Sequence, residues 1–160
     1  MAEPTTVEHE IPKDIIFAIG NYVQLCARIE KLIVRAVLIV ENLEGEKLKN
    51  RAAQLYKMST KELIGAVKEI SERLNEGHRW AVYFRELRPY LYEFVDNRHK
   101  TIHGVVTFDP ALQVSYFDKK SGEFVTETVG LEAVNAMLSH ADQIVRALIS
   151  FCSEAAVENS

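Results

Sequence analysis

The sequence predicts a mainly α-helical fold, an antiparallel bundle of four to five helices with a small β-hairpin or meander inserted before the last helix. Three observations predict it. Apolar residues recur at steps of three and four over most of the chain, which is typical of helices with a buried face. Between residues 105 and 128 the apolar period falls to two, which is typical of short strands. The chain has 160 residues and is 48% apolar, so we expect one core and a single domain over residues 1–160.

The first expected helix runs from Pro12 to about Leu43, and Gly45 is expected to end it. It carries two apolar rows, one of which includes Tyr22 and Cys26. A helix at the surface of a domain needs only one apolar row. The second row therefore indicates either a contact with a second copy of the chain or a central helix wrapped by its own domain, and both interpretations stay open.

Two shorter helices are expected next, over residues 46–58 and 60–74. Ser59 and Glu62 have the spacing of a capping box, in which each residue accepts a hydrogen bond from the backbone of the other. The second of the two helices should therefore begin directly after Ser59.

The fourth expected helix, from about Trp80 to His103, contains Pro89, which should kink it or make it start afresh. Gly104 is expected to stop this helix in a left-handed conformation. We expect the remaining elements to be three strands and a last helix, at Val105–Phe108, Leu112–Phe117, Glu123–Thr128 and Leu131–Cys152.

Composition excludes several classes of protein. The formal charge of −4 and the pI near 5.8 argue against a surface wholly devoted to nucleic acid but leave room for a local basic site. Cys26 and Cys152 stand apart in apolar runs, which favours packed thiols in a reducing compartment. Residues 1–11 are expected to be a flexible tail without an export signal. The cytoplasm is therefore the expected compartment. Polar residues interrupt the longest apolar stretch, so we expect no membrane span and no membrane contact.

The residues richest in chemistry form the segment from Asp96 to Gly104. Arg98 carries a five-donor fork suited to phosphate oxygens, and His103 can move a proton near neutral pH. Arg98 is followed directly by a polar residue, His99, and five residues after Arg98 come His103 and then Gly104. This pattern resembles the motif of HEPN domains, which are helical bundles. The setting late on a helix, with a last helix to follow, is similar as well.

The resemblance implies a homodimeric, metal-independent ribonuclease without a cofactor, of the kind used in toxin–antitoxin systems or anti-phage defence. It implies RNA as substrate and an antitoxin or a nucleotidyltransferase subunit as a partner protein. Some family members carry a Tyr to which an antitoxin attaches a nucleotide. Val105 occupies that position here, so this form of regulation is not expected.

Helix geometry also favours a shared site. Five residues turn a helix by about 500°, so Arg98 and His103 point roughly 140° apart and lie about 7.5 Å apart along the axis. One helix cannot aim both at the same phosphate, whereas two helix ends facing across a two-fold axis can. We expect His103 to act as base and acid, Arg98 to stabilise the charged transition state and His99 to assist. Asn97 and Lys100 are expected to hold neighbouring phosphates.

Three alternatives remain open. Cations at the end of a helix are favoured by its dipole, so the motif has a purely structural interpretation. A second alternative is a non-catalytic helical dimer that binds a protein or a nucleotide. A third is a metal site, because Asp96, His99 and His103 share one helical face.

Overall fold

The structure is a computed structural model that describes residues 11–108 and 112–158. Apart from Ile11, the tail expected over residues 1–11 lies outside the described residues. Residues 109–111, between the first two expected strands, also lie outside them.

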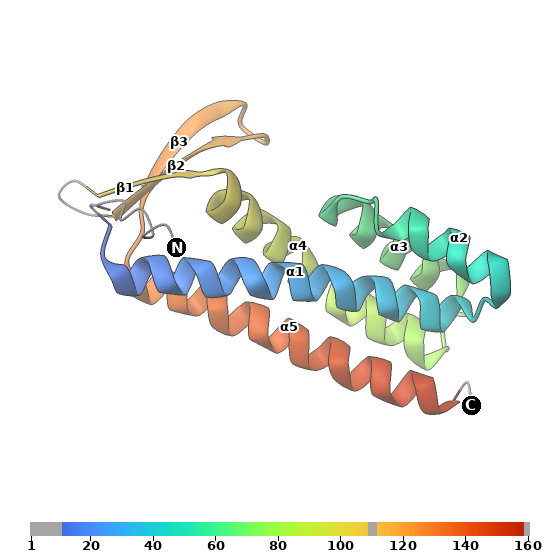
Figure 1. The fold of residues 1–160 in the computed structure, drawn as a ribbon. Coiled ribbons are helices and arrows are strands. Elements are labelled where there is room, and N and C mark those ends of the chain that lie inside the picture. The colour runs from blue at the N-terminus through green and yellow to red at the C-terminus, as the bar shows by residue number, and fades with distance from the viewer. Residues whose placement is uncertain (1–10, 109–111, 159–160) are drawn as a thin grey trace, which may run out of the picture.

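The described residues form five helices and three strands, and this confirms the predicted fold class (Figure 1). In chain order the elements are α1 (Lys13–Glu41), α2 (Gly45–Leu55), α3 (Thr60–Arg73), α4 (Arg79–His103), β1 (Val105–Phe108), β2 (Leu112–Asp118), β3 (Glu123–Thr128) and α5 (Leu131–Glu158).

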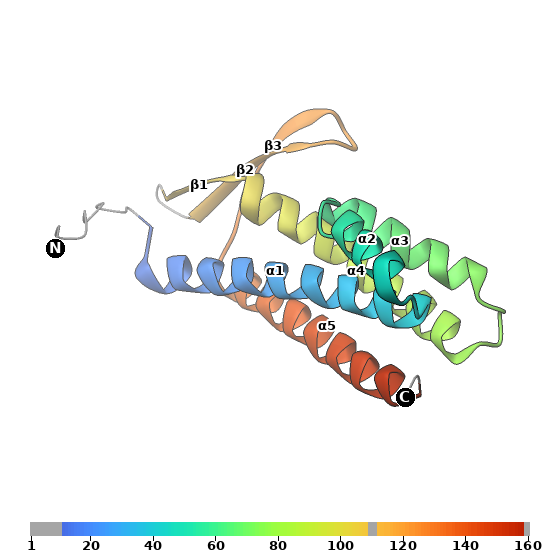
Figure 2. The ribbon, with the colours of Figure 1, turned by 45° about the vertical axis from the view of Figure 1, so that its right-hand side comes forward.

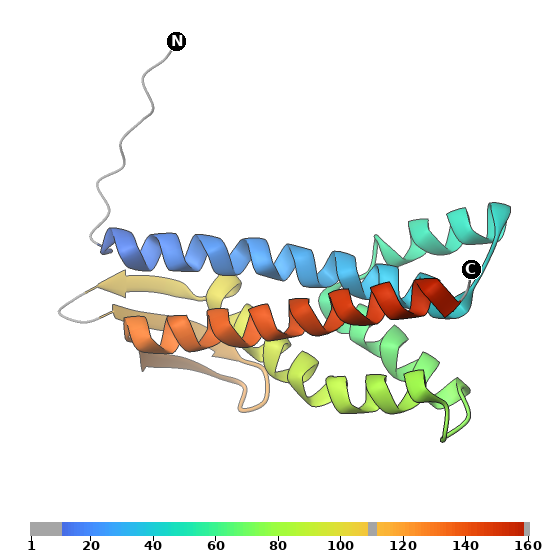
Figure 3. The same cartoon turned by 90° about the horizontal axis from the view of Figure 1, so that it is seen from below.

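The core lies where α1, α3, α4 and α5 meet. α1 and α5 lie side by side over most of their length, as Figures 1 and 3 show. One apolar row of α1 supplies Tyr22, Ile29 and Ile33, all at most 1% exposed. The second row, represented by Leu25 and Leu32, is only partly buried against the same core. The first row thus accounts for the packing of the domain and the second is left partly open.

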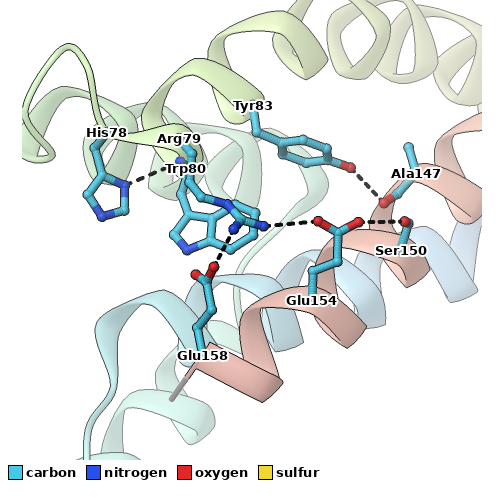
Figure 4. Close-up of polar contacts among 8 residues, drawn as sticks. All are labelled: His78, Arg79, Trp80, Tyr83, Ala147, Ser150, Glu154 and Glu158. Carbon is cyan, nitrogen blue, oxygen red and sulfur yellow. Dashed lines mark hydrogen bonds and ion pairs between the residues drawn. The ribbon is translucent and has the colours of Figure 1, made fainter. Parts of the chain in front are cut away.

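The N-terminal half of α4 is fixed to α5 by polar contacts (Figure 4) and by aromatic packing. The Tyr83 hydroxyl donates a hydrogen bond of 2.6 Å to the carbonyl of Ala147, and its ring stacks on Phe151 at 5.0 Å between centroids. Arg79 forms an ion pair of 3.0 Å with Glu154 at the surface. These contacts set the direction in which α4 leaves the bundle, and so the position of its C-terminal end.

The three strands form an antiparallel meander in the order β1-β2-β3, as the sequence predicted. The sheet lies at the C-terminal end of α4 (Figure 2). β2 alternates between buried and half-exposed positions over its first five residues, and Leu112, Val114 and Tyr116 are its buried side chains. β2 therefore has one apolar face, and it contacts α4.

Several predicted helix ends agree with the structure and others do not. The capping box of Ser59 and Glu62 is confirmed. The expectation that Gly45 ends the first helix is wrong, because α1 ends at Glu41 with Asn42 left-handed at φ 46°, and Gly45 opens α2. α5 continues six residues beyond Cys152, since Ala155 adds another buried side chain to its apolar face.

Two expectations concern α4. Of the two outcomes expected at Pro89, a kink or a new start, the new start does not occur, because Pro89 lies inside one continuous helix. Gly104 is not left-handed: its φ is −77° and its ψ is 142°, so the chain passes directly from helix into strand. A Cβ atom at this position would lie 2.2 Å from the carbonyl oxygen of Lys100 and 2.6 Å from the side chain of Val114. Glycine is needed here for close packing and not for a positive φ.

Candidate functional site

Arg98 lies near the end of α4 and faces α1. Its Nε atom is 3.2 Å from a carboxylate oxygen of Glu30, and both side chains are about a quarter to a third exposed, at 27% and 29%. The contact is an ion pair, since Nε makes no hydrogen bond to any described residue. Glu30 also accepts a hydrogen bond from the hydroxyl of Thr60 at the start of α3. Residues from three helices therefore hold the guanidinium in place.

The two terminal nitrogens of Arg98 are not used in this way. Within the described part of the chain, no residue forms a hydrogen bond with them, and the 3.2 Å contact with Glu30 is made at Nε. Because the guanidinium of Arg carries five donors in a planar fork, fixing it through Nε leaves the two outer nitrogens able to bind an anion in a bidentate manner.

α1 contributes the buried side chains of Tyr22 and Cys26, on both of which the charge of Arg98 acts. Burial raises the pKa of the Cys26 thiol to about 11, and the hydrogen bond to Tyr22 and the charge of Arg98 only partly oppose this rise. Burial likewise raises the pKa of Tyr22. Both groups are therefore protonated at neutral pH, so Cys26 is a packed thiol, as predicted, and not a nucleophile.

The two histidines of the motif lie on the side of α4 that faces the sheet. Nε2 of His99 is 3.0 Å from the carbonyl oxygen of Phe117 in β2. A carbonyl can only accept a hydrogen bond, so this nitrogen carries a proton and donates it to the backbone of β2. The His103 ring is 5.4 Å from that of His99 between centroids, and its residue is exposed. One imidazole is thus anchored, and its neighbour is open to solvent.

Lys100 connects the same helix end to the sheet. Its amino group lies 3.1 and 3.2 Å from the two carboxylate oxygens of Glu127 in β3. Tyr116 donates a hydrogen bond of 2.7 Å to the same carboxylate. The hydrogen bonds from Tyr116 and Lys100 lower the pKa of Glu127. Burial alone would lower the pKa of Lys100, but the hydrogen bonds with Glu127 and Tyr116 outweigh it, and that pKa is raised.

The phosphate-binding roles predicted for Lys100 and Asn97 stay predictions. The charge of Lys100 is balanced by Glu127, so contact with a phosphate would compete with that pair. Asn97 is half-buried, and its backbone carbonyl accepts a hydrogen bond of 2.8 Å from Thr101.

The metal site considered from the sequence finds no support in these contacts. Asp96 forms an ion pair of 3.1 Å with Lys120, and His99 is directed to the backbone of β2. Among the residues that the structure describes, no group of three His, Cys, Asp or Glu side chains is placed to hold a metal ion.

Sequence reasoning missed two features of this site. The first is the support of Arg98 by Glu30 and Thr60, which join helices far apart in the chain. The second is the row on α4 that continues the face of His99 and His103 toward its N-terminus. This row includes Tyr92, which is 49% exposed, and the cations Arg85 and Arg88. The helical period would have revealed the row, because these positions recur at steps of three, four and seven.

A comparison with protein-family models finds no match, and searches of curated proteins and of solved structures find none either. Over the described residues, no helix is long and apolar enough to cross a membrane.

Proposed function

We propose that the protein is a homodimeric, metal-independent endoribonuclease of the HEPN type. In this proposal two copies bring their α4 ends together, and Arg98 of one copy acts with His103 of the other. The proposed setting is the cytoplasm, in toxin–antitoxin or anti-phage defence, with an antitoxin or a nucleotidyltransferase as partner protein.

One observation carries the proposal. At the same helix end, Arg98 is held at Nε and its outer nitrogens make no hydrogen bond to a described residue, whereas His103 is exposed on the side that faces the sheet. The arrangement leaves one anion-binding group and one proton-transfer group on different sides of the helix, and a two-fold axis can pair them.

The chemistry needs only groups that the chain supplies. A base removes the proton of the RNA 2′-OH, whose oxygen then attacks the adjacent phosphorus. The outer nitrogens of Arg98 stabilise the negative charge on the non-bridging oxygens. An imidazolium protonates the leaving 5′ oxygen, and the products are a 2′,3′-cyclic phosphate and a free 5′-OH. His103 fills the proton-transfer role, and His99 holds the neighbouring ring in position.

The row on α4 gives this site a path for single-stranded RNA. Arg85 and Arg88 form no ion pair with any described acid, and Tyr92 offers an exposed ring between them and the histidines. From Arg85 to His103 the helix rises about 27 Å, which is long enough for several nucleotides. Asp96 lies on the same face between Tyr92 and His99, and its charge is paired with Lys120. Stacking of a base on Tyr92 and contacts between phosphates and the two arginines would guide the strand past this pair to His103.

The test is cleavage of a fluorescent single-stranded RNA in buffer containing EDTA, with the wild-type protein, Arg98→Ala and His103→Ala. We expect the wild type to form a 2′,3′-cyclic phosphate end and each variant to lose at least about a hundredfold in rate. Arg146→Ala and His78→Asn serve as controls. Arg146 is an exposed arginine on α5, and His78 caps the opposite end of α4, a role that Asn can keep. Cleavage that survives in the Arg98 or His103 variants would refute the assignment.

A second candidate function is a non-catalytic helical dimer that serves as a scaffold for a protein or a nucleotide. The ion pair between Arg98 and Glu30 favours it, because a partly buried pair also fixes α4 to α1. In this case the wild type cleaves no RNA, and Arg98→Ala lowers the melting temperature. Arg98→Lys separates the two candidates, since a lysine can keep a charge near Glu30 but cannot bind phosphate through a planar fork.

A further inference from the structure

A groove follows the C-terminal half of α1 between α2 and the end of α5. Its volume is about 630 Å³. Figure 1 shows α2 above this part of α1 and α5 below it. Leu32 and Leu38 of α1 and Leu48 and Tyr56 from α2 and its C-terminus give it apolar walls. Tyr56 is 63% exposed, so a large aromatic surface faces solvent at its rim. An apolar groove of this kind accommodates the apolar face of a helix.

The charges around the groove have one sign. Arg28, Lys31 and Arg35 follow each other at steps of three and four along α1, and all three line the groove. No acidic side chain lines it, and none of the three cations pairs with an acid among the described residues. The neighbouring groove beside α3 differs, because its cations Arg51 and Arg73 both pair with Glu41. The cationic rim is therefore a local feature of a chain whose net charge is −4.

We propose that this groove binds an acidic amphipathic helix of a different protein. The apolar side chains of that helix pack on Leu32, Leu38 and Tyr56, and its carboxylates lie against Arg28, Lys31 and Arg35. From residue 28 to residue 42, α1 rises about 21 Å, which corresponds to about four turns of a bound helix. The proposal is independent of RNA cleavage, since it uses no residue of the motif.

A second copy of the chain fits the groove less well. A two-fold dimer through this face would place the same surface on both sides of the interface. The cations on α1 of one copy would then oppose those of the other, and like charges across an interface are unfavourable. The charge of the rim therefore selects an acidic partner and directs self-association to another face of the molecule.

The test uses three synthetic 18-residue peptides and fluorescence anisotropy with the full chain. The first carries Leu at helical spacing with Glu on both sides, the second is its scrambled form, and the third has Lys in place of Glu. We expect the first to bind, with an affinity that falls as salt rises. The combined variant R28E/K31E/R35E should bind it at least about tenfold more weakly and should gain binding to the Lys peptide. Arg85→Glu makes the same kind of charge change on α4 and should leave both affinities unchanged.

Three results would overturn the proposal. In the first, the scrambled peptide binds as tightly as the amphipathic one. In the second, Arg85→Glu weakens binding as much as the combined variant does. In the third, sedimentation shows that the combined variant, still helical by circular dichroism, turns a wild-type dimer into a monomer, which would assign the groove to a second copy.

Discussion

Of the seven glycines, Gly104 is the one whose position leaves no space for a side chain. It joins α4 to β1 at the point where the backbone of Lys100 and the side chain of Val114 come together. Its backbone angles are open to any residue, so the constraint is the lack of space for a Cβ atom. The motif thus ends in a glycine because the sheet packs directly on the helix end that carries the histidines.

Replacing Gly104 with alanine tests this account. A Cβ atom 2.2 Å from the carbonyl oxygen of Lys100 cannot be accommodated unless the helix end or β2 moves. We expect Gly104→Ala to lower the free energy of unfolding by about 2–3 kcal/mol in urea titrations. Gly20→Ala is the matched control, because a Cβ atom there meets nothing within 4 Å. That change, in an exposed helical position, should gain about 0.5–1 kcal/mol. Equal effects of the two changes would contradict the account.

At the scale of elements, the sequence predicts what depends on local pattern and misses what depends on contacts distant in the chain. The period of two placed the strands correctly, and the Ser59 capping box placed the start of α3. Gly104 was misjudged because a glycine after a helix most often adopts a positive φ, whereas here the nearby Val114 decides. The pair of Arg98 with Glu30 had no local signal, since only the folded bundle brings α4 to α1.

The ion pair between Lys100 of α4 and Glu127 of β3 leads to a prediction about how stability depends on pH. The pKa of Glu127 is below its usual 4.5 in the folded state, so its contribution to stability is present above about pH 4.5 and is lost as pH falls through the lowered value. The pKa of Lys100 is raised above 10.5, so its contribution is present below that pH and is lost as pH rises through the folded value. The ion pair between Lys100 and Glu127 should therefore contribute most to stability between these two pH limits.

Glu127→Gln should remove the part of the stability that the wild type loses as the pH falls. Both partners are about two-fifths exposed, so we expect a loss of less than about 1 kcal/mol at neutral pH. Urea unfolding between about pH 3 and pH 7 should show the wild type losing more stability on acidification than the variant does. Parallel curves for the two proteins would show that this pair does not contribute.

At the scale of the whole molecule, the proposed activity depends on symmetry. α4 holds Arg98 against α1 and directs His99 to the sheet, so one chain presents the two kinds of group on different sides. The cationic groove on α1 is unsuited to pairing with itself, which favours a dimer through the surface around α4. The partner-binding groove and the proposed nuclease site would then occupy different faces, so one chain could carry both.

Mixing two inactive variants tests whether a site is shared between chains. In a dimer with two composite sites, each using Arg98 from one copy and His103 from the other, a mixed dimer of Arg98→Ala and His103→Ala chains keeps one intact site. Random exchange makes half of the dimers mixed, so RNA cleavage should return to about a quarter of the wild-type rate. The variants alone should stay inactive, and native mass spectrometry should verify that mixed dimers form. If mixed dimers form without activity while the wild type cleaves RNA, Arg98 and His103 must act from the same chain or be needed in both copies, and the one-Arg, one-His composite site is wrong.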